Sequence, residues 1–223
     1  MKIKILVVAI TFIALAALSV AGFYIYKNYL VKPETKVEEN EAAPSGSENG
    51  PEDSGQEALK ETRLVKNGFE ITLPPGWQEA TTLPEGILLM AIDTREDASG
   101  GVFKKLDFRT SLSIKSDDIA NYANLGSFED YVASVKTSLI QTISGISFAG
   151  EEQKMINGAQ AILIECSSRQ EEADFKTLLV FVKGNNSAVY ALSFNTLQDS
   201  WSVYKSLFYW TAESFKLKYK IEL

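Results

Sequence analysis

The chain opens with an uncharged run of 22 residues, Ile5–Tyr26, that has two lysines on each side. At a rise of about 1.5 Å per residue, a helix of this length measures about 33 Å, which is enough to cross a bilayer core of about 30 Å. No cysteine directly follows the run, so there is no site for a lipid anchor. The run therefore predicts a single transmembrane helix within residues 1–32, with everything after it on one side of the membrane.

The same run also fits a secretory signal peptide cleaved after Ala21, because Ser19 and Ala21 are small residues that a signal peptidase accepts. Cleavage would release a secreted protein. A cleavage site normally ends the apolar run, whereas here residues 22–26 continue it, and three tyrosines between residues 24 and 29 fit an interfacial aromatic belt. These residues favour a retained anchor. The short basic N-terminal tail favours a C-terminal domain on the extracytoplasmic side of the cell membrane.

Residues 33–62 are rich in Glu, Ser, Gly and Pro. Between residues 33 and 60 there are eight acidic residues, two lysines and no aromatic residue. Such a segment buries too little apolar surface to offset the entropy of ordering, and its like charges extend it. We expect a disordered acidic linker that holds a globular domain, residues 63–223, roughly 30 Å from the membrane surface.

Composition excludes several functions of this domain. The chain has no histidine and a single cysteine, Cys166, so it can form neither a Ser-His-Asp site, nor a zinc site of His and Cys ligands, nor an intramolecular disulfide. Residues 61–223 contain 21 acidic and 16 basic residues, and this net charge of −5 argues against nucleic-acid binding, which needs basic side chains to displace counterions. We expect no catalytic residue, no cofactor and no metal. Cys166 is expected to be a small buried side chain.

Apolar patterns predict seven strands in the domain. They are expected over Phe69–Leu73, Ile87–Ile92, Phe103–Ile114, Ile146–Ile156, Ala159–Ser167, Phe175–Val182 and Ala188–Phe194. Asn157-Gly158 is a strong signal for a two-residue hairpin turn. The last three strands are apolar on both alternating faces, which is typical of strands covered on both sides.

Two helices are expected beside these strands. Ser127 begins a stretch like a capping box, and apolar residues then recur at helical spacing as far as Gly145. Asp199 is expected to cap a second helix, with an apolar stripe between Trp201 and Phe215. The order predicts an α+β domain, a mostly antiparallel sheet of about seven strands sandwiched by two helices (α/β/α), preceded by the transmembrane helix.

Five stretches of the domain carry a family resemblance. They are Gly68–Trp77, Ser127–Tyr131, Lys154–Ala161, Val189–Phe194 and Ser214–Lys216. Together they resemble the PsbP-like superfamily, which has the fold of the extrinsic photosystem II protein, over about residues 63–220. The resemblance implies an antiparallel sheet between helices. It implies no single function, because relatives include photosystem subunits, Ran-binding proteins and bacterial envelope proteins.

Two functional hypotheses follow. The favoured one is a membrane-tethered, extracytoplasmic, non-enzymatic binding or scaffold domain, because the long linker gives the domain reach to find an envelope protein or an apolar ligand. Its partner-binding residues are expected near residues 93–105, where charged side chains lie beside apolar ones: Arg95, Val102, Phe103, Lys104 and Lys105. The alternative is a carrier of an apolar ligand, or an enzyme, that uses a pocket between the sheet and the helix at 127–144.

Overall fold

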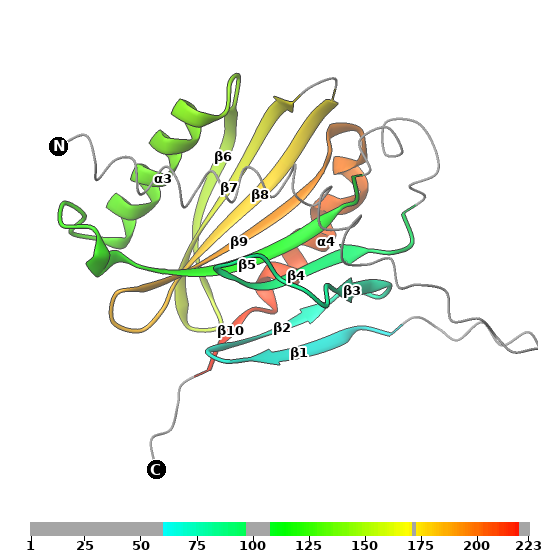
Figure 1. The fold of residues 1–223 in the computed structure, drawn as a ribbon, viewed down its shortest axis with the longest axis horizontal. Helices are drawn as coiled ribbons and strands as arrows, with labels where there is room; N and C mark the ends of the chain where they lie inside the picture. Colours follow the sequence, from blue (N-terminus) through cyan, green and yellow to red (C-terminus); the bar gives the residue numbers. More distant parts are fainter. Residues whose placement is uncertain (1–59, 97–107, 171–172, 219–223) are drawn as a thin grey trace, which may run out of the picture.

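The computed structural model describes residues 60–96, 108–170 and 173–218, and Figure 1 shows how their elements are arranged. The expected transmembrane helix Ile5–Tyr26 and the expected linker as far as residue 59 lie outside these ranges, and both stay predictions. Four of the expected partner-binding residues, Val102, Phe103, Lys104 and Lys105, also lie outside them. Of the helices that are described, none is long and apolar enough to cross a membrane.

Seven of the described strands form the central sheet. Its spatial order is β3 (Trp77–Glu79), β4 (Ile87–Asp93), β5 (Ser111–Asp118), β9 (Ala188–Leu197), β8 (Ala173–Lys183), β7 (Ala159–Gln170) and β6 (Ser147–Ile156). Neighbouring strands pair antiparallel throughout. Asn157 and Gly158 join β6 to β7 with φ of 47° and 85°, the left-handed values that a type I′ turn requires, so the predicted hairpin is confirmed.

Three other described strands form a smaller sheet. β2 (Phe69–Leu73) is its central strand, between β1 (Thr62–Lys66) and the short β10 (Lys216–Leu217). Every second residue of β2 is buried in the main core, which joins the small sheet to the large one. The predicted strand over 69–73 is confirmed, but its expected place in the seven-stranded sheet is corrected, because its partners are β1 and β10.

Two α-helices of the described chain cover opposite faces of the central sheet. α3 (Phe128–Thr142) packs on one face and α4 (Trp201–Glu213) on the other. The alternation within β8 shows this arrangement, since Leu178 and Val180 belong to the core beneath α4 whereas Leu179 and Phe181 belong to the core beneath α3. The predicted α/β/α sandwich is confirmed for these residues, and the small sheet adds to its α4 side.

Local signals placed the start of one helix correctly and missed the other. Ser127 caps α3 as predicted, since its Oγ accepts a hydrogen bond of 3.0 Å from the backbone N–H of Asp130. Asp199 does not cap α4. It lies in the 3₁₀ helix η3 (Gln198–Ser200), and Ser200 is the residue that precedes α4. A second 3₁₀ helix, η2 (Ile119–Asn121), follows β5.

The strand predicted over Phe103–Ile114 is confirmed over residues 111–114 and wrong over residues 108–110, which precede the strand, while residues 103–107 lie outside the described ranges. β5 begins at Ser111 and continues to Asp118. Phe108 lies before the strand, where its side chain packs in a separate apolar cluster with residues of β8 and β9: Ala173, Phe175 and Leu197. The apolar residue that suggested a strand is therefore buried by packing at the end of the sheet.

Candidate functional site

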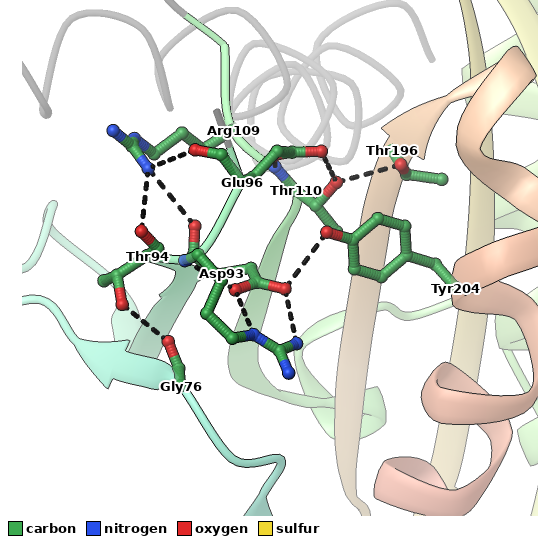
Figure 2. A network of polar contacts seen from close by, with 9 residues as sticks. Gly76, Asp93, Thr94, Glu96, Arg109, Thr110, Thr196 and Tyr204 are labelled. Carbon is green, nitrogen blue, oxygen red and sulfur yellow. Dashed lines mark hydrogen bonds and ion pairs between the residues drawn. The ribbon is translucent and has the colours of Figure 1, made fainter. Parts of the chain in front are cut away.

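The connection between β4 and β5 contains the one expected partner-binding residue that the structure describes, Arg95. Asp93 ends β4, and its backbone N–H donates a hydrogen bond of 3.0 Å to the carbonyl of Thr110, just before β5. Figure 2 shows the polar side chains that gather at this point. We call Asp93, Arg95, Glu96, Arg109 and Thr110 the loop-base cluster, because they lie on the two chain segments that enter and leave this connection.

Asp93 is the buried centre of the cluster, with 2% of its side chain exposed. It accepts hydrogen bonds from Arg95 through the backbone N–H (2.9 Å), Nε (2.9 Å) and Nη2 (2.7 Å). The hydroxyl of Tyr204 on α4 donates a further one of 3.0 Å. Burial opposes ionisation of the carboxyl, but these hydrogen bonds outweigh it and lower the pKa of Asp93. Asp93 is thus an ionised group whose donors come from both the loop and α4.

Glu96 connects the loop to the central strands. Its Oε2 accepts from the backbone N–H of Thr110 at 2.6 Å and its Oε1 from the Thr110 hydroxyl at 2.9 Å. The Thr110 hydroxyl also lies 2.9 Å from that of Thr196 on β9, and both threonines are fully buried. Burial raises the pKa of Glu96. The same carboxylate therefore fixes the end of the connection against the sheet.

Arg109 closes the cluster from the other segment. Its Nη1 donates to the carbonyl of Glu96 at 3.0 Å and lies 3.5 Å from the carbonyls of Asp93 and Thr94. One guanidinium group thus contacts the carbonyls of three of the four residues from Asp93 to Glu96. Such charge-assisted hydrogen bonds fix loop geometry more strongly than neutral ones.

The side chain of Arg95 packs against the turn before β3, at Gly76. Gly76 has a φ of +80°, and a Cβ added there would lie 2.4 Å from Cδ of Arg95. The Gly76 carbonyl also accepts hydrogen bonds from the backbone N–H (3.1 Å) and the hydroxyl (2.7 Å) of Thr94. The Pro-Pro-Gly-Trp stretch therefore does more than end a strand, since its glycine lets the Arg95 stem lie against the backbone.

The arrangement is suited to presenting a surface. Both carboxylates of the cluster already accept hydrogen bonds from side chains of this chain, whereas 43% of the Arg95 side chain remains exposed. Within residues 60–96, 108–170 and 173–218, no group of three His, Cys, Asp or Glu could hold a metal ion. Cys166 is buried as expected, and burial raises the pKa of its thiol to about 12.

The sequence pointed to Arg95 as a partner-binding residue, which stays a prediction, and did not point to most of the cluster around it. Tyr204 lies 111 residues from Asp93, so no local spacing could pair them. Glu96 directly follows Arg95, and Arg109 lies four residues after Lys105; only the mixture of charges in this stretch pointed to them. Gly76 offered a usable signal, because a glycine after two prolines often marks a positive φ.

The site of the alternative hypothesis, between the sheet and α3, is filled by side chains of the domain. Tyr131, Val135 and Leu139 of α3 are buried against apolar residues of β7, β8 and β9. At one end of this interface the hydroxyls of Tyr122 and Tyr131 donate to Oδ2 of Asp117, at 2.7 and 2.9 Å. Among the described residues, the interface is an apolar core with these two hydrogen bonds at its margin.

Comparisons with known proteins agree with this architecture. The sequence profile of the PsbP family matches residues 59–217. The solution structure of cyanobacterial PsbP (CyanoP) from Synechocystis sp. PCC 6803 is 20% identical, with a TM-score of 0.50, and the match covers 79% of this chain and all of that one. No curated protein gave a significant match.

Two further solved structures are similar to this chain. LpqN of Mycobacterium tuberculosis, described as involved in cell envelope biogenesis, is 12% identical with a TM-score of 0.50, and the match covers 72% of this chain and 92% of LpqN. The Ran-binding protein Mog1p of Saccharomyces cerevisiae is 9% identical with a TM-score of 0.49, and the match covers 72% and 96% of the two chains. Because the family profile spans most of the described residues, the chain belongs to the PsbP family.

Proposed function

We propose that this chain is a membrane-tethered, extracytoplasmic, non-enzymatic binding or scaffold domain, and that the edge around Arg95 contacts its partner. The observation that carries the proposal is the loop-base cluster. The carboxylates of Asp93 and Glu96 already accept hydrogen bonds within the chain. We infer that the cluster holds the exposed guanidinium of Arg95 in a fixed position. A rigid, exposed arginine is a typical anchor residue at protein interfaces, where Arg is enriched.

The placement at a membrane rests on the sequence. The run Ile5–Tyr26 is long enough to cross a bilayer, and the acidic segment after it fits a tether that raises the local concentration of the domain near membrane partners. LpqN, which shares the fold, is described as involved in cell envelope biogenesis, and this supports an envelope role for the present chain. The packed interface beneath α3 favours this proposal over a carrier or an enzyme.

Site-specific photocrosslinking of the full-length chain in its own membrane tests the proposal. A photoreactive residue at Gln78, which is exposed on β3 next to the edge, is compared with one at Ile140, which is exposed on α3. We expect one stoichiometric protein adduct at position 78 and none at position 140. Arg95→Glu should abolish this adduct, whereas Arg169→Glu, the same charge change at the β7–β8 end, should leave it intact.

Equal crosslinking at both positions, or an adduct that survives Arg95→Glu, would contradict the assignment of this edge. A lipid that co-purifies in a one-to-one ratio in place of a protein adduct would instead support the apolar-ligand carrier. Circular dichroism of each variant separates loss of binding from loss of folding.

A further inference from the structure

The outer face of the small sheet collects basic side chains from strands that are far apart in sequence. Alternate residues of β2 from Phe69 to Leu73 are buried in the core, so Glu70 lies on the outer face. Glu70 is directly opposite Val65 of β1 and Lys216 of β10. Cross-strand partners project from the same face, and Arg63 lies two residues from Val65 on that face too.

Glu70 organises the cations of this face. Nη2 of Arg63 lies 2.8 and 2.9 Å from its two carboxylate oxygens, and Nζ of Lys218 lies 2.6 Å from one of them. Hydrogen bonds from Lys218 and Arg63 lower the pKa of Glu70 to about 2. The carboxylate is therefore ionised under all ordinary conditions, and it holds two cations side by side at the surface.

The face has the opposite charge to the rest of the domain. We call Arg63, Val65, Glu70, Lys216 and Lys218 the basic face, which carries three cations and one anion; the exposed Glu61, two residues before Arg63, adds a second anion beside it, so the local net charge is +1. Residues 61–223 as a whole carry a net charge of −5. The face also exposes apolar surface at its middle, since Val65 is 62% exposed. An anionic surface would therefore attract this face and repel the remainder of the domain.

The chain enters the domain at this same face. β1 begins at Thr62, which was expected to be the last residue of the linker, so the basic face is the part of the described domain closest along the chain to the expected anchor. In Figure 1 the small sheet lies at the side of the molecule away from α3. A tether that ends beside the face keeps the face at high effective concentration near whatever holds the tether.

We propose that the basic face docks the domain on an anionic lipid surface, with Val65 at the headgroup level and α3 pointing away from the membrane. The proposal rests on the proposed membrane anchor, because only a tethered domain stays close enough for so few charges to matter. Lys216 and Lys218 provide cations for lipid phosphates, and Arg63 adds a planar donor group that suits phosphate oxygens.

Full-length chain reconstituted into vesicles tests this docking. A fluorophore is attached to Val65→Cys or, as the control, to Ile140→Cys on α3, and its quenching by a headgroup-linked quencher is measured. Cys166 stays unlabelled because it is buried and its thiol pKa is about 12. Vesicles of phosphatidylcholine alone are compared with vesicles that contain about 30% phosphatidylglycerol, a fraction typical of strongly anionic membranes.

With anionic vesicles we expect quenching at position 65 to exceed quenching at position 140 at least about five-fold, and added salt should remove the difference because it screens the attraction. Lys216→Glu should lower the quenching at position 65 about five-fold or more, whereas Arg169→Glu, at the β7–β8 end, should not. Equal quenching at positions 65 and 140, or quenching at position 65 that is the same with neutral and anionic vesicles, would overturn the docking.

The membrane anchor is tested separately, by measuring whether the chain floats with neutral phosphatidylcholine vesicles at high salt. A chain that fails to float overturns the anchor, and its binding to added anionic vesicles still tests the basic face. If the chain floats but quenching at position 65 does not depend on lipid charge, the membrane anchor is supported and the docking of the basic face is contradicted. If Lys216→Glu unfolds the small sheet, the docking is tested by the salt and lipid comparisons made with the chain that retains Lys216.

Discussion

Ser113 lies in the middle of β5, and its Oγ is buried without a hydrogen-bond partner among the described residues. A buried hydroxyl without a partner costs about 1–3 kcal/mol relative to its hydration in water. We expect Ser113→Ala to raise the free energy of unfolding by about 1 kcal/mol, measured by urea denaturation.

Ser193, directly opposite on β9, is the matched control, because its Oγ accepts a hydrogen bond of 3.1 Å from Asn195. Ser193→Ala should lower stability by about 1 kcal/mol. If both variants lose stability equally, Ser113 has a partner beyond the described ranges.

Gly76 and Gly86 have nearly the same backbone conformation but different surroundings. Their φ angles are +80° and +79°, yet a Cβ at Gly76 would meet Arg95 whereas one at Gly86 would meet nothing within 4 Å. Either substitution by alanine costs about 1 kcal/mol for the left-handed conformation. We expect Gly76→Ala to cost about 2 kcal/mol or more, because it also displaces Arg95 from Asp93.

Urea denaturation of the two glycine variants checks the difference. An equal loss of stability in both would show that the Arg95 stem moves aside freely. In that case the loop-base cluster would not be rigid.

At the scale of elements, a buried hydrogen bond from Tyr204 to Asp93 joins α4 to the loop-base cluster. Tyr204→Phe removes the donor to Asp93 and leaves a buried carboxylate with fewer partners. We expect a loss of about 1.5–3 kcal/mol, the range for hydrogen bonds to charged groups.

Tyr209→Phe is the matched control on the same helix. Its hydroxyl donates to Glu165 at 2.9 Å, in a more exposed setting where Lys205 also contacts that carboxylate. We expect Tyr209→Phe to cost less than about 1 kcal/mol. Thermal or urea unfolding should rank the two variants in this order, and the reverse order would mean that Asp93 compensates through Arg95 alone.

Elements defined by nearby residues could be predicted from the sequence, and those defined by distant partners could not. The Ser127 cap and the Asn157-Gly158 turn depend on residues within a few positions, and both were predicted correctly. β10 has only two residues and exists because β2 lies beside it, 146 residues away in sequence at Glu70 and Lys216. No periodicity can appear in two residues, so the small sheet was missed.

The same reason limits prediction of the candidate site. Arg95 could be proposed from the charges around it, whereas Tyr204 and Thr196 reach the cluster only through the packing of α4 and β9. The sandwich itself could be predicted, since apolar residues on both alternating faces of β8 and β9 require cover on both sides.

For the whole molecule, Glu70 should make stability depend on acid pH. Its pKa is about 2 in the folded state and 4.5 as an ordinary value, so the folded state binds the proton more weakly than the unfolded chain. The resulting stabilisation is present above about pH 4.5 and is lost as the pH falls toward 2. Glu96 has the opposite effect on the pH dependence of stability. Because its pKa is raised in the folded state, protonation of Glu96 favours folding as the pH falls.

We expect Glu70→Gln to narrow the difference in unfolding free energy between pH 7 and pH 3, measured by urea denaturation at both values. Glu85→Gln, at an exposed position before β4, serves as the control and should leave the difference unchanged. A difference as large in Glu70→Gln as in the unaltered chain would assign the acid sensitivity to other carboxylates.

The small sheet also determines when the domain can be finished during synthesis. β2 is paired on one side with the first strand and on the other with the last, and the ring of Phe69 stacks on that of Phe215 at 5.3 Å. These contacts cannot form until the ribosome has made nearly the whole domain. Early strands would stay incomplete while the chain emerges, since contacts of large sequence separation form slowly. The small sheet is therefore the last part of the described domain to be completed, and the domain stays partly unfolded until its C-terminal residues have been made.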